Sequence, residues 1–284
     1  MKKIIAVGFF FGLFVMALPS TAQILDSPPR DAAYDKTHTI ENTPLPYAYV
    51  READVMWEKR LWRVIDMEEK INQVFYYPEL PHNQWRSLMQ VIIDALKEGS
   101  ITAYDASLPT DEFTAPLTFQ ELMNTLERAD TMSLQRPYPP YDWYDTVISV
   151  TFNPSTVKKI RIKEDWFFDK HRSMLDVRIL GICPIVEDYD EKGDFRAFKP
   201  LFWIYFPEAR NIFAKAEVFN RMNSSNRLTY DDVFHKRIFN SYIYKEDNVF
   251  DRKISEYATG LDALLEAERI KYELFEFEQN LWEY

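Results

Sequence analysis

Three aspartates and one histidine lie close together in the sequence and have side chains suited to acid–base catalysis or metal binding. They are Asp165, Asp169, His171 and Asp176. The alternation of a strand places Asp165 opposite the apolar face that includes Trp166, and the other three fall in or beside a polar turn. These residues therefore predict the solvated end of a hairpin and no catalytic centre.

The acidic segment that follows imitates the start of a calcium-binding loop. Asp188, Asp190 and Gly193 have the spacing of such a loop. Lys192 and Lys199 occupy its fifth and twelfth positions, however, where oxygen ligands are needed. No metal-ligand spacing relates the four histidines, His38, His82, His171 and His235. We therefore predict no metal and no cofactor.

The single cysteine, Cys183, lies in a strongly apolar run and is predicted to be a small buried hydrophobic residue. It lacks an activating neighbour in the sequence, and no nucleophile elbow is present. Only six glycines occur in the chain, and none forms a phosphate-binding loop. We therefore predict that the protein is not an enzyme.

Composition indicates a folded, acidic protein. The chain is 46% hydrophobic, and its 34 basic and 45 acidic side chains give a formal net charge of -11. Binding to nucleic acid or to an anionic membrane needs a basic surface, so this balance argues against both classes.

The N-terminus has the features of an export signal. The basic start Met1-Lys-Lys3 precedes the apolar run Ile4–Leu18 and the small residues Ser20-Thr-Ala22. This run is short for a membrane span, so we expect cleavage after Ala22; an uncleaved anchor is the alternative. Without a cysteine to acylate at that point, we expect membrane attachment only through a partner.

Apolar and basic residues alternate in Lys159-Ile-Arg-Ile-Lys163, which predicts a strand that places Ile160, Ile162, Trp166 and Phe168 on one face. Met174–Val186 and Leu201–Phe206 follow as further strands, and Val147–Phe152 is a fourth candidate. Short polar connections favour an antiparallel meander around residues 146–206.

Helical spacing of apolar residues predicts helices at Glu52–Gln73 and Gln84–Lys97 and a long amphipathic C-terminal helix from Asp251. Gly99 is the predicted stop of the second. Thr118 and Glu121 predict a capping box at the start of another helix.

An internal duplication is suggested by two similar segments. The strand candidate Ile101–Tyr104 precedes Leu117–Leu122, and the strand candidate Phe213–Glu217 precedes the matching Leu228–Val233, whose helix we expect to continue to Tyr242. Coincidence between two ordinary helix starts is the alternative.

The predicted fold class is α+β, an antiparallel sheet with packed helices. The predicted organisation is a signal peptide (1–22), an extended linker (23–48), an N-terminal helical or α+β subdomain (49–136), a β-rich α+β subdomain (137–250) and the C-terminal amphipathic helix (251–284).

Aromatic and aliphatic residues outside the sheet are candidates for contacts with partner proteins. They are Tyr141 and Trp143 in the middle of the chain, and Leu274, Phe277, Leu281 and Trp282 near its end. The C-terminal helix either packs on its own domain or docks on another subunit.

Several segments carry a resemblance to a known family: Tyr49–Asn72, Tyr76-Tyr77-Pro78, Ile101–Asp105, Ile160–Asp169, Leu180–Pro184, Leu201–Arg210 and Thr229–Phe234. In this order they resemble the gliding motility protein GldN (PorN) family of the type IX secretion system of Bacteroidetes. The resemblance covers nearly the whole mature chain, and the close paralogue GldO is an alternative within the family.

The resemblance implies a non-enzymatic periplasmic component. Members of the family self-associate in rings with the outer-membrane lipoprotein GldK (PorK) and contact the periplasmic domain of GldM (PorM). A periplasmic carbohydrate-processing enzyme or glycan-binding protein is the alternative. Two carboxylates that face each other across a cleft would favour it.

Overall fold

The computed structural model describes residue 33 and residues 37–82, 85–108, 111–126, 128–139, 141–150, 152–189, 194–223 and 225–281. The chain divides into a first unit, residues 1–35, and a second, residues 36–284. The predicted signal peptide lies outside the described residues, and the description below concerns the second unit.

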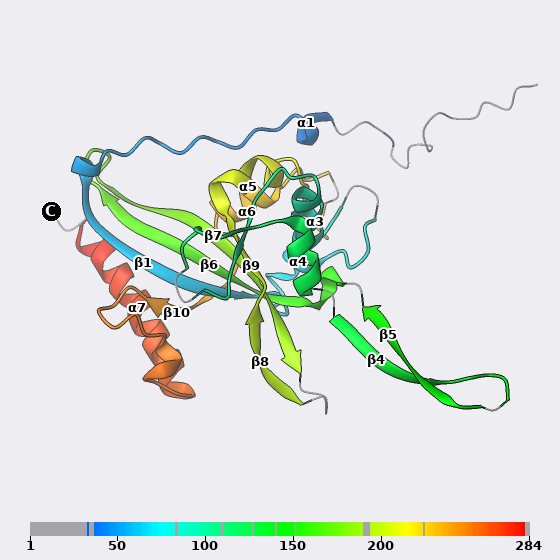
Figure 1. Ribbon diagram of the computed structural model, residues 1–284. Helices are drawn as coiled ribbons and strands as arrows, with labels where there is room; N and C mark the ends of the chain where they lie inside the picture. Colours follow the sequence, from blue (N-terminus) through cyan, green and yellow to red (C-terminus); the bar gives the residue numbers. More distant parts are fainter. Residues whose placement is uncertain are drawn as a thin grey trace, which may run out of the picture. The chain divides into compact units, whose positions relative to one another are not determined.

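One long antiparallel sheet organises this unit (Figure 1). Its strand order is β10-β1-β6-β7-β9-β2-β3, and β8 pairs with the C-terminal part of β7, residues 185–189. The strands are β1 (Val55–Asp66), β2 (Ala103–Asp105), β3 (Pro116–Leu117), β6 (Val157–Asp169), β7 (Met174–Tyr189), β8 (Phe195–Pro200), β9 (Phe202–Tyr205) and β10 (Tyr242–Glu246). The predicted meander is confirmed in β6, β7 and β9, and the α+β class with it.

The first predicted helix, Glu52–Gln73, is wrong, because most of this segment is the strand β1. Arg60 pairs with Asp165 of β6, and Ile65 pairs with Ile160. From Leu61 to Ile65 every residue of β1 is buried, so both faces of the strand are covered. A strand buried on both faces has no polar alternation, and its apolar run can match a helical stripe.

Val147–Phe152 does not extend the meander as predicted. β4 (Arg128–Gln135) and β5 (Trp143–Val150) instead form a separate two-stranded sheet. Phe152 lies beyond β5 and packs against the main core. Apolar alternation identified the strand, but it carries no information on which strand is its partner.

Six short helices are described: α1 (Thr37–Ile40), α2 (Gln73–Tyr76), α3 (Leu88–Lys97), α4 (Phe119–Leu126), α5 (Phe206–Phe213) and α6 (Tyr230–His235). The long helix α7 (Leu261–Asn280) follows near the C-terminus. Three-residue 3-10 turns lie at Glu52–Asp54, Pro154–Thr156 and Ile254–Glu256. Helix α3 confirms the prediction for Gln84–Lys97, although it starts later. Gly99, at φ 70, follows it.

Capping boxes start the helices that the sequence marked with threonine. Thr118 Oγ1 accepts from the amide of Glu121 at 3.3 Å, and the Glu121 carboxylate accepts from the amide of Thr118 at 3.0 Å. Thr229 and Asp232 do the same for α6. Both Leu-Thr segments therefore start helices, whereas the duplication itself stays a hypothesis.

Three helix and strand boundaries differ from the predictions. Phe213–Glu217 is no strand: Phe213 ends α5, and Glu217 forms only an isolated bridge to Thr229. The helix predicted to run on to Tyr242 ends at His235, and Tyr242 begins β10. The C-terminal helix begins at Leu261, after the 3-10 turn Ile254–Glu256.

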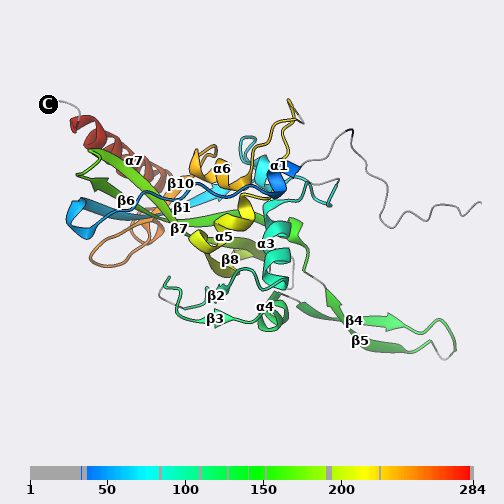
Figure 2. The same ribbon diagram turned by 90° about the horizontal axis from the view of Figure 1, so that it is seen from above.

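Three hydrophobic clusters form the core. The largest joins α3, α5 and α6 to strand residues such as Ile160 and Ile162. A second packs α7 against Leu61 of β1 and Ile243 of β10, and Figure 2 shows α7 beside β10. The third contains Trp62, Cys183 and Trp203. Phe113 packs on this third cluster, over Gly181, where a Cβ would come within 2.7 Å of its ring.

A buried ion pair links β6 to the segment after α6. The Glu164 side chain is 0% exposed and accepts from Nη1 and Nη2 of Arg237 at 2.9 Å and 3.1 Å. Trp166 Nε1 donates to the same carboxylate at 3.1 Å. Arg237 has φ 52, an unfavourable backbone conformation for arginine, so the pair holds a strained turn in place.

Replacing Glu164 by Gln should lower the free energy of unfolding by about 3 kcal/mol, because the change leaves the Arg237 guanidinium without its counter-charge. Urea unfolding of the purified protein measures the loss. The control is Arg86→Gln, which breaks a pair with Asp94 in which both side chains are nearly half exposed. Equal effects of the two substitutions would contradict the structural importance of Glu164.

Candidate interaction surfaces

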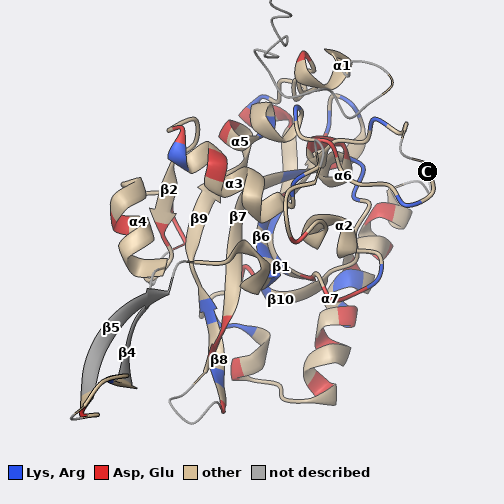
Figure 3. Cartoon of the chain, turned by 90° about the vertical axis from the view of Figure 1, so that its right-hand side faces the viewer, with Lys and Arg blue, Asp and Glu red and all other residues tan. Residues whose placement is uncertain are grey.

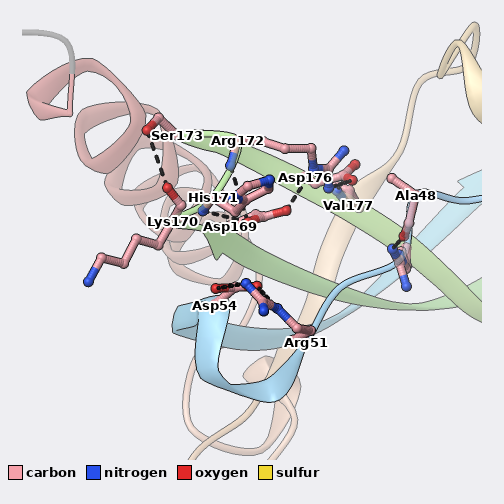
Figure 4. Close-up of polar contacts among 11 residues, drawn as sticks. Ala48, Arg51, Asp54, Asp169, Lys170, His171, Arg172, Ser173, Asp176 and Val177 are labelled. Atoms are coloured by element: carbon pink, nitrogen blue, oxygen red, sulfur yellow. Dashed lines mark hydrogen bonds and ion pairs between the residues drawn. The ribbon is translucent and has the colours of Figure 1, made fainter.

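The acidic cluster singled out in the sequence builds the β6–β7 turn (Figure 4). Asp169 accepts from the amide of His171 at 2.8 Å and from Arg172 Nε at 2.7 Å. Arg172 also donates to Asp176 at 2.8 Å. Asp169 is only 2% exposed, so the hairpin end is less solvated than predicted.

Asp165, the fourth residue of this acidic cluster, does not take part in the contacts of the β6–β7 turn. Its carboxylate accepts from Nε and Nη2 of Arg60, on β1, at 2.6 Å and 3.0 Å. The three aspartates are therefore held by arginines in contacts that join strands or close a turn.

Asp169 makes stability depend on pH. Hydrogen bonds from Arg172 and from backbone amides hold the pKa of Asp169 below its usual range. An unfolded aspartate has a pKa of about 3.9, so this stabilisation is complete above about pH 5 and is lost as pH falls through the unfolded and then the lower, folded pKa. The difference in melting temperature between wild type and Asp169→Asn should therefore shrink between about pH 5 and about pH 3. A difference independent of pH would contradict this role.

The calcium-like segment is not assembled as a site in the described part of the chain. Asp188 lies on β7 opposite Ala197 of β8, and residues 190–193 are outside the described residues. No group of three or more His, Cys, Asp or Glu side chains within the described ranges could hold a metal ion.

Cys183 is buried, as predicted, and lies in the cluster of Trp62 and Trp203. Burial raises the pKa of its thiol to about 12. Because the thiolate is the reactive species, the folded protein should contain almost none of it at neutral pH.

In the native protein Cys183 should therefore resist Ellman's reagent and react only on unfolding. Cys183→Ser should cause a modest loss of stability, because a hydroxyl is placed among apolar side chains. Labelling time courses with and without denaturant give the measurement. Rapid labelling of the native protein would show a role for the thiol.

Two of the residues proposed for partner contacts pack within the chain itself. Leu274 is 5% exposed and lies with Ala267 and Ile270 in the second cluster. The ring of Phe277 stacks on Trp57 with centroids 4.5 Å apart. Leu281 is 36% exposed, and Trp282 lies outside the described residues.

A second apolar face of α7 points to solvent. Its residues are each 57% to 69% exposed: Leu261, Leu264, Leu265, Tyr272 and Phe275. None of these five residues is among the contact residues predicted from the sequence. The spacings of seven residues from Leu265 to Tyr272 and of three from Tyr272 to Phe275 could have revealed this face. Helix α7 is therefore apolar on two sides.

Charged residues lie beside and within this outward face. Helix α7 carries six acidic and two basic residues, and the acidic ones can be followed in Figure 3. Arg269 pairs with Glu266 and Glu273, which neutralises part of the negative charge of the helix. Glu268 itself lies within the outward face, four residues after Leu264 and four before Tyr272. Exposed apolar side chains next to polar and charged ones are typical of a protein contact surface.

Tyr141 and Trp143 lie at the connection between β4 and β5. They are 54% and 68% exposed, and Tyr138 beside them is 75% exposed. Tyr141 has φ 59, and its amide donates to the carbonyl of Tyr138 at 3.0 Å, which closes the turn. A two-stranded ribbon with exposed aromatic residues at its turn is a second candidate contact surface.

Comparison with known proteins gives the class of this protein. The family model described as gliding motility associated protein GldN matches residues 50–283, and no curated protein matches the chain. The chain is therefore a protein associated with gliding motility and type IX secretion. It belongs to the GldN family, as the resemblance predicted. Within the described residues, no helix is long and apolar enough to span a membrane.

Proposed function

We propose that this protein is a non-enzymatic structural component of the type IX secretion and gliding machinery. In this proposal it acts in the periplasm at the inner face of the outer membrane. It self-associates in a ring with the lipoprotein GldK (PorK), which provides its membrane attachment, and it contacts the periplasmic domain of GldM (PorM). Nucleic acid is not a partner.

The outward face of α7 is the observation that carries this proposal. Large apolar residues seldom gather on the surface of a protein that works alone, and here the opposite side of the same helix already provides its packing on the sheet. The face is thus surplus to the fold of the chain and available to a neighbour. Membership of the GldN family supports an assembly role for it.

A carbohydrate-processing function has less support. An open depression of about 550 Å³ contains Glu58, Asp165 and Trp57, which is the right kind of lining for a sugar site. Asp165, however, is held by two hydrogen bonds from Arg60. Paired in this way, it is poorly suited to proton transfer or nucleophilic attack on a glycosidic bond.

The double substitution Leu265→Ser and Phe275→Ser tests the docking face. Both side chains are more than half exposed, so each change should alter the free energy of unfolding by no more than about 0.5 kcal/mol. Stoichiometric copurification of GldK from native membranes should nevertheless be lost. The comparison variant Leu274→Ala removes a buried side chain and should cost about 2–5 kcal/mol.

Thermal melts run beside the pulldown separate the two effects. A folded double variant that still copurifies GldK would remove the α7 face from the proposal. Retention of the wild-type protein in outer-membrane fractions from cells without GldK would contradict the proposed attachment. Normal secretion in cells lacking this protein would overturn the proposed function as a whole.

A further inference from the structure

A pocket of about 330 Å³ lies between α7 and the sheet. Its floor and walls come from four parts of the chain: β1, β6, the segment after α6, and α7 itself. The side chains that matter are Arg63, Trp166, Arg237, Phe239, Lys271 and Phe275. Aromatic rings and cations therefore line the same small space.

Arg63 is the unusual member of this lining. It is 8% exposed, and its Nε donates to the Ser241 hydroxyl at 2.9 Å. Among the described residues, no carboxylate lies within ion-pair distance of it and no acceptor is bound to its Nη groups. Burial lowers the pKa of Arg63, as expected for a cation removed from water. Buried arginines are normally paired, so this one has capacity to bind an anion.

The nearest buried carboxylate is already used. Glu164 accepts two hydrogen bonds from Arg237 and a third from Trp166. Glu164 balances the charge of Arg237, so the positive charge of Arg63 is left without a bonded counter-charge. At the rim Lys271 and Glu278 oppose each other in sign, and Lys271 also lies 3.4 Å from Glu268. The unbalanced positive charge is therefore that of Arg63, at the floor of the pocket.

The lining defines the ligand chemically. A guanidinium offers two parallel N–H donors, which fit a carboxylate, and the rings of Trp166, Phe239 and Phe275 fit an apolar group next to it. We propose that this pocket binds the side-chain carboxylate of an Asp or Glu that a partner protein presents beside an apolar residue. Arg63 is the group that receives the carboxylate.

Continuity with the outward face of α7 assigns the carboxylate to a protein. Phe275 lines the pocket and is also 57% exposed on that face, so one partner segment can cover both. This assignment of the source rests on the proposed function. The affinity of the pocket for a carboxylate does not, and it is measured on the purified chain.

The probe is 3-phenylpropionate, which combines a carboxylate with an aromatic ring. Its neutral isostere 3-phenylpropanamide is the matched control ligand. In titrations followed by amide chemical shifts, the carboxylate should bind saturably and the amide at least about tenfold more weakly, because only the carboxylate gains a charge-assisted pair. Equal binding of the two ligands, or no binding of the carboxylate, would overturn the proposal.

Protein variants locate the interaction. Arg63→Gln should weaken 3-phenylpropionate binding by at least about tenfold, because it removes the receiving charge. The control variant Arg269→Gln removes a cation of α7 whose side chain does not line the pocket. This variant should bind 3-phenylpropionate as the wild type does. Unchanged binding by a folded Arg63→Gln protein would overturn the role of Arg63. The comparison of the two ligands tests the pocket even if that variant fails to fold.

A photoactivatable benzoylphenylalanine in place of Phe275 identifies the source in cells. The proposal expects a cross-link to a partner protein within a few residues of an Asp or Glu, and its loss when Arg63→Gln is added. Probe binding without any protein cross-link would overturn the partner-protein source and assign the pocket to a small free carboxylate. The proposed function is tested separately: normal secretion by cells that lack this protein would contradict it without affecting the result for the pocket.

Discussion

The buried pair of Glu164 and Arg237 is the interaction on which the arrangement around α7 depends. Glu164 is fixed on β6, in the middle of the sheet, and Arg237 lies in the turn that follows α6. Its two hydrogen bonds hold a backbone conformation that arginine does not favour. The chain leaves this turn to form β10, the edge strand on which α7 packs. The position of the last helix thus follows from one carboxylate inside the sheet.

Helix α7 has more apolar surface than its own packing needs. Ala267, Ile270 and Leu274 attach it to β1 and β10, and a helix of this length needs only one such stripe. The outward leucines and aromatic residues leave a second stripe open. Because the ion pair and the inward stripe hold the helix in place, this outward face is presented to a neighbour without further ordering, which favours affinity.

Whether a strand or helix could be predicted from the sequence depended on which of its faces are buried. β6 was found because apolar and basic residues alternate in Lys159–Lys163, and β7 because an apolar run follows a polar turn. The start of α6 was found because Leu228–Val233 matches the segment that begins with Leu117. β1 was mistaken for a helix because residues 61–65 are buried on both faces. That error also hid the pocket, since Arg63 faces Trp166 and α7 only when its segment is a strand paired with β6.

Three other buried cations in the described part of the chain have partners of a kind that Arg63 lacks. Arg210 has Asp231 at 2.8 Å, and Lys245 has Asp251 at 2.6 Å. Lys163 donates to the carbonyl of Asp111 at 2.8 Å and lies over two aromatic rings. Arg63 has only the hydroxyl of Ser241, among the described residues, and an open pocket. Arg63 is thus a buried cation whose counter-charge a partner can supply, and departures from the rule that buried charges are paired gather at functional sites.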